Sequence, residues 1–132
     1  RFAEKGAVEV TERVAREDLS AFGNRAGPRP PRAADMEVGP DGMLVPQRPP
    51  TSTGASTFAD PTAAPLTGHY HTIPEGTEMP PGLAVVRDGS DVLPGSPHPP
   101  THATIYPTEP ITPDTFTDRF LGLPWEYGGK KK

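Results

Sequence analysis

The 132-residue chain contains no cysteine, few large aliphatic side chains and no long apolar run. Without cysteine there is no disulfide, no thiolate nucleophile and no cysteine-based zinc site. No apolar stretch approaches the roughly 18 residues that a membrane span requires. The sequence therefore predicts neither a disulfide scaffold nor a membrane partner.

Several motifs that mark particular chemistries are also missing: the sequence has no Walker loop, GxGxxG, HExxH or nucleophile elbow. His69 and His71 would share one face of a strand, but a closed site needs one or two further ligands, so we expect no metal. The net charge of −4 and a pI near 5.5 argue against broad nucleic-acid binding. The run Lys130–Lys132 is interpreted as a solvated tail.

What the chain does have in abundance is proline and glycine, with 20 prolines and 14 glycines making up about a quarter of it. Leu, Ile, Val and Phe total only 23 residues. These counts approach those of disordered proteins, but the net charge is small and aromatic residues are present. We therefore expect a single α+β domain over residues 1–132, rich in loops and thin in its core.

Residue patterns predict two helices separated by short strands. A helix is expected over residues 11–22, with Thr11 as its cap and Gly23-Asn24 as its stop. A second begins after Thr112 with Pro113 in its first turn, and it should bury Phe116 and Phe120 together with Leu123 and Trp125. The expected strands span residues 43–45, 68–73, 83–86 and 101–106.

The last of these strands has two different faces. Ala103 and Ile105 alternate with His102, Thr104 and Tyr106. The apolar pair should face the core, which directs His102 toward a cleft or toward solvent.

A series of short motifs singles out three residues that would otherwise be unremarkable. Taken singly, Arg32 is interpreted as a solvated arginine, Ser56 as a turn residue, and His102 as a strand histidine whose ring is hydrogen-bonded within the fold. Together they belong to an ordered series: Arg32-Ala-Ala-Asp-Met, Gly39-Pro-Asp-Gly, Ala55-Ser-Thr-Phe, Ile73-Pro-Glu-Gly-Thr-Glu-Met-Pro-Pro-Gly-Leu, Asp88, Thr101-His-Ala-Thr-Ile-Tyr-Pro and Pro110-Ile. This series resembles the ADP-ribosyltransferase-like toxin family of type VI secretion, over about residues 30–125.

The resemblance implies a fold and a substrate. The fold would be of ADP-ribosyltransferase type, with a small mixed β-sheet split into two halves that hold NAD between them. Residues 30–125 would form the family-like core, preceded by a helical part at 1–29. The toxin would transfer ADP-ribose from NAD, or hydrolyse NAD, in the cytoplasm of a target cell, and a cognate immunity protein is a possible partner.

The resemblance also implies site residues. Arg32 matches a family arginine and would clamp the pyrophosphate, because a guanidinium meets phosphate oxygens with two parallel hydrogen bonds. Ser56 matches a family serine, and we expect Ser56 and His102 to be catalytic. Ser56, Thr57 and Phe58 would contribute to cofactor binding along with Arg32.

Two other interpretations stay open. The chain has no Glu-x-Glu or Gln-x-Glu pair, which such transferases carry, so a non-catalytic domain of the same fold that binds a macromolecule or an immunity protein is an alternative. The proline content also allows a proline-rich interaction segment.

Overall fold

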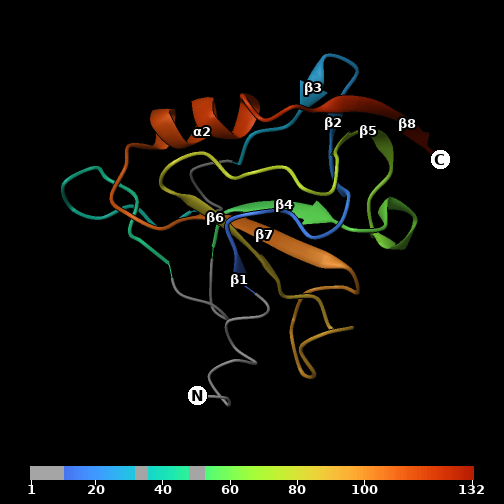
Figure 1. Cartoon of the computed structure of the whole chain (residues 1–132), viewed down its shortest axis with the longest axis horizontal. Coiled ribbons are helices and arrows are strands. Elements are labelled where there is room, and N and C mark those ends of the chain that lie inside the picture. Colours follow the sequence, from blue (N-terminus) through green and yellow to red (C-terminus); the bar gives the residue numbers. More distant parts are fainter. Residues whose placement is uncertain (1–10, 32–35, 48–52) are drawn as a thin grey trace.

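The computed structural model describes residues 11–31, 36–47 and 53–132, which form one eight-stranded sheet and one α-helix (Figure 1). The elements in chain order are β1 (Thr11–Glu12), β2 (Leu19–Asn24), β3 (Gly27–Pro28), β4 (Ala55–Phe58), a 3-10 turn at Pro61–Ala63, β5 (Gly68–Ile73), β6 (Leu83–Arg87), β7 (His102–Pro107), α2 (Pro113–Leu121) and β8 (Glu126–Lys131). The expected α+β class is confirmed. In this part of the chain no helix is long and apolar enough to cross a membrane.

The strands lie in the order β1-β6-β7-β4-β2-β5-β8, with β3 paired to β2. All pairings between these strands are antiparallel, so the expectation of a mixed sheet is wrong for the described strands. Parallel pairing needs a crossover connection, usually a helix, and the one α-helix of the described residues lies between β7 and β8, which do not pair with each other.

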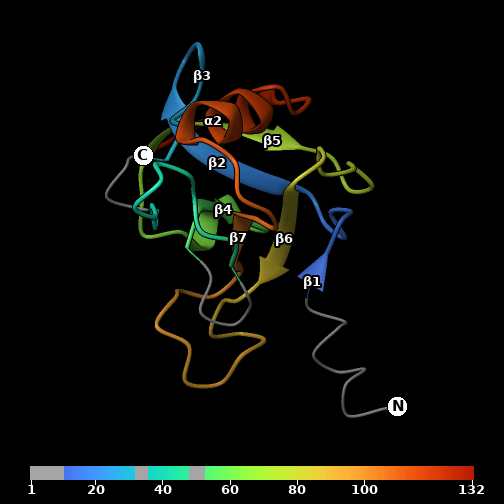
Figure 2. The same ribbon diagram turned by 90° about the vertical axis from the view of Figure 1, so that its left-hand side faces the viewer.

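The sheet is weakly joined at its centre. Strands β2 and β4 share a single residue pair, Ser20 with Phe58, whereas β2 and β5 are in register over Leu19–Gly23. One half of the sheet therefore consists of β1, β6, β7 and β4, and the other of β2, β3, β5 and β8. Figure 2 shows the two groups diverging from this central contact.

The expected helix over residues 11–22 is wrong, because the structure has strands β1 and β2 there. Leu19 and Ala21 are each only 2% exposed and face the main core, while Phe22 contacts aromatic rings on the opposite face. This period-2 alternation suits a strand. Pairing with β5 outweighs the helix propensity of the preceding Glu and Arg residues, as tertiary contacts often do.

The expected C-terminal helix is confirmed as α2. The Thr112 hydroxyl accepts the cap hydrogen bond, Pro113 lies in the first turn, and Phe116 and Phe120 are fully buried. In Figure 1, α2 runs alongside the sheet and leads into β8. Its two phenylalanines belong to the same core as side chains from both halves of the sheet, so the helix holds the halves together.

Trp125 completes this end of the core. The indole N–H of Trp125 donates to the Phe120 carbonyl at 2.8 Å, and the two rings lie 5.2 Å apart. Leu123 is buried beside them. The predicted burial is confirmed for Phe116, Phe120 and Leu123, whereas Trp125 is only partly buried against the same core.

The remaining strand predictions meet mixed outcomes. The strands at 68–73, 83–86 and 101–106 are confirmed within a residue at each end. Around residues 43–45 there is only an isolated bridge between Val38 and Leu44. The tail predicted as a solvated lysine run is part of β8, and the Lys131 ammonium donates to the carbonyl oxygens of Thr62 and Ala64.

Candidate functional site

An open cleft of about 470 Å³ lies where the two halves of the sheet diverge. One wall comes from Phe22, Gly23 and the following segment Arg29–Pro31. The facing wall consists of β4 and β7 side chains, of which Ser56 and His102 are the most reactive types. The cleft is therefore bounded by the same polypeptide segments that make the weak central contact of the sheet.

The β4–β7 register brings Ser56 and His102 together. Phe58 is directly opposite His102 and Ser56 is opposite Thr104, so the Ser56 and His102 side chains are diagonal neighbours on one face. The Ser56 Oγ lies 3.1 Å from the His102 Nε2. The edge of the Phe58 ring meets the imidazole at a centroid distance of 5.2 Å and fixes its orientation from behind.

Asp88 completes a line of three groups. It directly follows β6, and its own backbone N–H and that of Gly89 both donate to the His102 carbonyl at 3.1 Å. A Cβ at Gly89 would lie only 2.7 Å from the backbone nitrogen of His102, so the close approach of these two backbone segments requires glycine. The Asp88 carboxylate, 1% exposed, then lies 2.6 Å from the His102 Nδ1.

The protonation states follow from these contacts. Burial alone raises the pKa of Asp88, but hydrogen bonds from His102 and Thr104 outweigh it and hold that pKa below its usual 3.8. The carboxylate is therefore ionised near neutral pH and only accepts hydrogen bonds. The His102 Nδ1 is therefore the donor to Asp88, and in the neutral imidazole of this tautomer the Nε2 accepts a hydrogen bond from the Ser56 hydroxyl.

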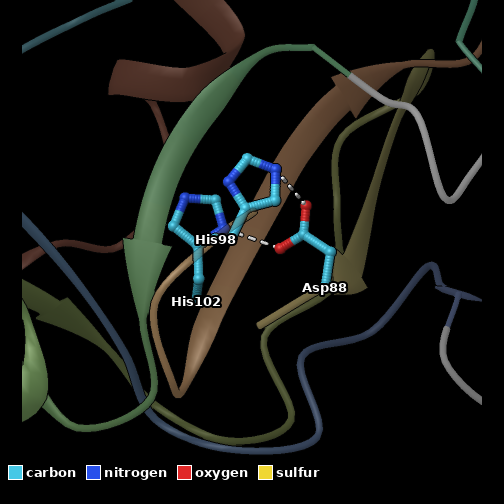
Figure 3. Close-up of side chains that lie close together, drawn as sticks. All are labelled: Asp88, His98 and His102. Atoms are coloured by element: carbon cyan, nitrogen blue, oxygen red, sulfur yellow. Dashed lines mark hydrogen bonds and ion pairs between the residues drawn. The ribbon is translucent and has the colours of Figure 1, made fainter. Parts of the chain in front are cut away.

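A second histidine lies against the first, as Figure 3 shows. The His98 ring stacks on the His102 ring, with 4.2 Å between the ring centroids and an angle of 5° between the ring planes. The His98 Nε2 lies 3.4 Å from the Asp88 carboxylate oxygen that does not contact His102. Burial lowers the pKa of His98 below its usual 6.5, and attraction by Asp88 offsets this only in part. His98 is consequently neutral near pH 7.

Asp88, His98 and His102 are also the group that could hold a metal within the described part of the chain, with ligand atoms within 4.8 Å of one another. Metal binding through the His102 Nδ1 requires loss of the proton that this atom donates to Asp88. His69 and His71 do not combine in this way: His69 contacts the Tyr127 hydroxyl and His71 contacts the Asn24 carbonyl. That no metal binds this protein stays a prediction.

Comparison with protein families identifies the chain. The model of the Tse2 ADP-ribosyltransferase toxin matches residues 9–123, which is most of the sequence. The chain belongs to the Tse2 ADP-ribosyltransferase toxin family. Searches of curated proteins and of solved structures found no match.

Membership of the Tse2 family confirms the resemblance inferred from the motif series and extends it to residue 9. Of the predicted site residues, the structure brings Ser56 and His102 together at the cleft. Phe58 is 3% exposed and packs behind His102. The Thr57 side chain is fully buried, and its hydroxyl donates to the Ala103 carbonyl at 2.9 Å. Arg32 lies outside the described residues.

Sequence reasoning missed the role of Asp88. It appeared in the motif series but otherwise looked like the first residue of an Asp-Gly turn after an apolar strand. A stronger signal was available, because pairing the strand at 83–86 with that at 101–106 places the residue that follows the first strand near the start of the second. The search for a nucleophile looked for a local glycine motif, whereas the groups that line up behind Ser56, Asp88 and His102, lie 32 and 46 positions away in the sequence.

Proposed function

We propose that this member of the Tse2 family binds NAD in the cleft and transfers its ADP-ribose to an acceptor, or hydrolyses it, in the cytoplasm of a target cell reached by type VI secretion. The family match over residues 9–123 is the observation that carries this proposal. The position of Ser56 and His102 on the cleft wall supports it. In this proposal residues 1–132 form one domain of ADP-ribosyltransferase type, with its core at 30–125.

The pyrophosphate of NAD needs a cation, and Arg29 is in position to supply one. Arg29 lines both the 470 Å³ cleft and a neighbouring cleft of about 650 Å³, which also contacts His71 and Trp125. A dinucleotide lying across both clefts would pass Arg29, a cation that suits its phosphates. Arg32, three residues further along the same proline-flanked segment, is the second candidate clamp.

The ribose next to the nicotinamide would lie at Ser56 and His102. The exposed Ser56 offers its hydroxyl to the sugar, and the buried imidazole behind it is held by Asp88 on one side and Phe58 on the other. Groups fixed in this way lose little further freedom when substrate binds. Thr57 and Phe58 would then act by shaping the wall rather than by touching NAD.

Calorimetric titration with NAD and an assay for nicotinamide release test the proposal. We expect saturable NAD binding and turnover, with turnover at least about tenfold lower in Ser56→Ala and His102→Gln. Ser90→Ala, another exposed serine, and His69→Gln are matched controls that should behave as wild type.

The opposite result would favour a different class of function. If the folded protein neither binds NAD nor releases nicotinamide, while toxicity on expression survives Ser56→Ala and His102→Gln, the domain acts by binding a macromolecule. A cognate immunity protein remains a proposed partner in either case.

A further inference from the structure

We propose that Lys131, the last residue of β8, is a positioning residue for the cleft. It ties down residues 61–67, which we call the strap, and so holds Leu66 and Thr67 where a bound nucleotide contacts them. The tether rests on the contacts of Lys131 alone, whereas the nucleotide as ligand rests on the proposed function. The Tse2 match ends at residue 123, so β8 lies outside the matched residues.

The strap crosses from one half of the sheet to the other and borders the cleft. It begins after β4 with the 3-10 turn at Pro61–Ala63 and ends at β5. Leu66 and Thr67 line the cleft of about 470 Å³. Leu66 is 45% exposed, and Leu66 and Phe22 are the largest apolar side chains among the described residues that line this cleft. A planar ring that enters the cleft would remove apolar surface of Leu66 from water, which favours binding.

The strap has little apolar burial of its own to hold it in place. Its 3-10 turn contains no buried residue, and Ala64 is the one buried side chain among residues 61–67, all of which the structure describes. Exposed segments with few buried contacts open at a low cost in free energy. The position of the strap therefore depends on polar contacts.

Lys131 supplies two of these polar contacts. In the sheet it pairs with Gly68, which follows the strap directly, and its half-buried side chain reaches back along the strap from there. The ammonium donates to the carbonyl oxygens of Thr62 at 3.2 Å and Ala64 at 2.5 Å. Figure 1 shows the end of β8 beside the chain that joins β4 to β5. Two bonds from one cation to one short turn fix both the place and the orientation of the turn.

Asp60 secures the start of the same turn. Its carboxylate accepts from the Thr62 hydroxyl at 2.7 Å and from the Thr62 backbone N–H at 2.9 Å. These hydrogen bonds hold the pKa of Asp60 below its usual 3.8, and the positive charge of Lys131 lowers it further. The turn is therefore held by an anion at its start and by a cation at its end, just before Leu66 and Thr67.

Loss of the tether should weaken binding by the fraction of time that the strap is displaced. The apparent dissociation constant of a ligand rises as the fraction of binding-competent protein falls, so a strap in place about a tenth of the time would weaken NAD binding about tenfold. At saturation the bound nucleotide itself holds the strap in place. The rate of the chemical step should therefore be unaffected.

Calorimetric titration and steady-state kinetics test this expectation. Lys131→Met keeps the long stem and removes the ammonium, and it should raise the Kd and KM for NAD about tenfold with kcat unchanged. Lys131→Arg keeps a cationic donor and should bind NAD within about twofold of wild type. Lys130→Met, at the exposed neighbouring position, is the matched control and should behave as wild type. An unchanged Kd in Lys131→Met, or an equal rise in Lys130→Met, would overturn the inference.

A double-mutant cycle shows whether Lys131 acts through the strap. Leu66→Ala leaves the tether intact and removes the largest apolar contact that the strap offers, so it should weaken NAD binding by itself. In that background Lys131→Met should cost little more, because there is no longer a leucine to place. Val92→Ala, at an exposed residue that lines neither cleft, is the control. Effects of the two substitutions that simply multiply would overturn the positioning role.

Hydrogen exchange of the free protein tests the tether without NAD. The backbone N–H groups of Thr62, Ala63 and Ala64 are hydrogen-bonded within the turn. We expect them to exchange about tenfold faster in Lys131→Met and at the wild-type rate in Lys130→Met.

The exchange and binding assays separate this inference from the proposed function. If these amides respond to Lys131→Met but wild type does not bind NAD, the proposed function fails and the nucleotide contact with it, while the tether stands. If NAD binds and the amides of the turn exchange equally in wild type and Lys131→Met, the proposed function stands and the tether is refuted.

Discussion

Two buried threonines on adjacent strands provide a direct measure of the charge on Asp88. The Thr104 hydroxyl donates to the Asp88 carboxylate, and the Thr57 hydroxyl donates to the neutral Ala103 carbonyl. Both side chains are at most 3% exposed. Valine at either position keeps the branched shape and the strand preference and removes only the hydroxyl. The variants therefore differ mainly in the acceptor that loses its donor.

The expected costs in free energy of unfolding follow from the type of acceptor. A hydrogen bond to a charged group contributes about 1.5–3 kcal/mol, and one between neutral groups about 0.5–1.5 kcal/mol. We expect Thr104→Val to be the more destabilising by about 1 kcal/mol, a visible part of a total stability of about 5–15 kcal/mol. Urea unfolding at pH 7 with linear extrapolation measures both values.

Acid should remove the difference between the two variants. The pKa of Asp88 is below 3.8 in the folded protein, so its charged contacts stabilise the fold above that pH and are lost as the pH falls through the folded pKa. The penalty of Thr104→Val should shrink as the pH falls through the folded-state pKa of Asp88, while that of Thr57→Val stays constant. Equal penalties of the two variants at pH 7 would refute an ionised Asp88. Thr57→Val should also leave NAD turnover intact.

Three further outcomes are expected. Phe120→Ala removes a fully buried ring from the core that joins helix and sheet, and should cost about 3–5 kcal/mol in urea unfolding; a loss under about 1 kcal/mol would contradict that packing. The pKa of His98, which faces Asp88 and His102, is lowered from 6.5 in the folded state, so the unfolded chain takes up the proton first. Wild type should therefore lose stability relative to His98→Gln as the pH falls through 6.5. Parallel plots of the free energy of unfolding against pH for the two proteins would contradict this. Arg32→Lys should lose most NAD turnover although the charge is kept, because lysine cannot make the forked phosphate contact; full turnover in that variant would remove Arg32 as a clamp.

The parts of the fold that sequence predicted well carry their signals locally. Helix α2 has a threonine cap, a first-turn proline and phenylalanines four residues apart, all within one short segment. Strand β7 shows its two faces in its own alternation, with Ala103 and Ile105 in the main core. Such features need no knowledge of what the segment packs against.

The parts that failed depend on partners distant in sequence. Segment 11–24 is rich in helix formers, and Leu19–Asn24 is a strand because it pairs with β5, about fifty residues away, over most of its length. The run Lys130–Lys132 was predicted to be solvated, but Lys130 and Lys131 belong to β8, which pairs with the edge of β5. For the same reason Ser56 and His102 were predicted singly, while the third member of the line, Asp88, was not assigned a role.

The interleaving of the two halves of the sheet has a consequence for how the protein folds. The chain alternates between them, from β1 to β2, from β3 to β4, from β4 to β5, from β5 to β6 and from β7 to β8. Neither half is a contiguous segment: the half with β7 needs the chain up to Pro107, and the half with β8 needs it up to Lys131. Sheets built from such distant pairings fold slowly, in milliseconds to seconds, because loop closure precedes the contacts that reward it. A newly synthesised or refolding chain therefore has no cleft, and no chemistry at Ser56, until nearly every strand is in place.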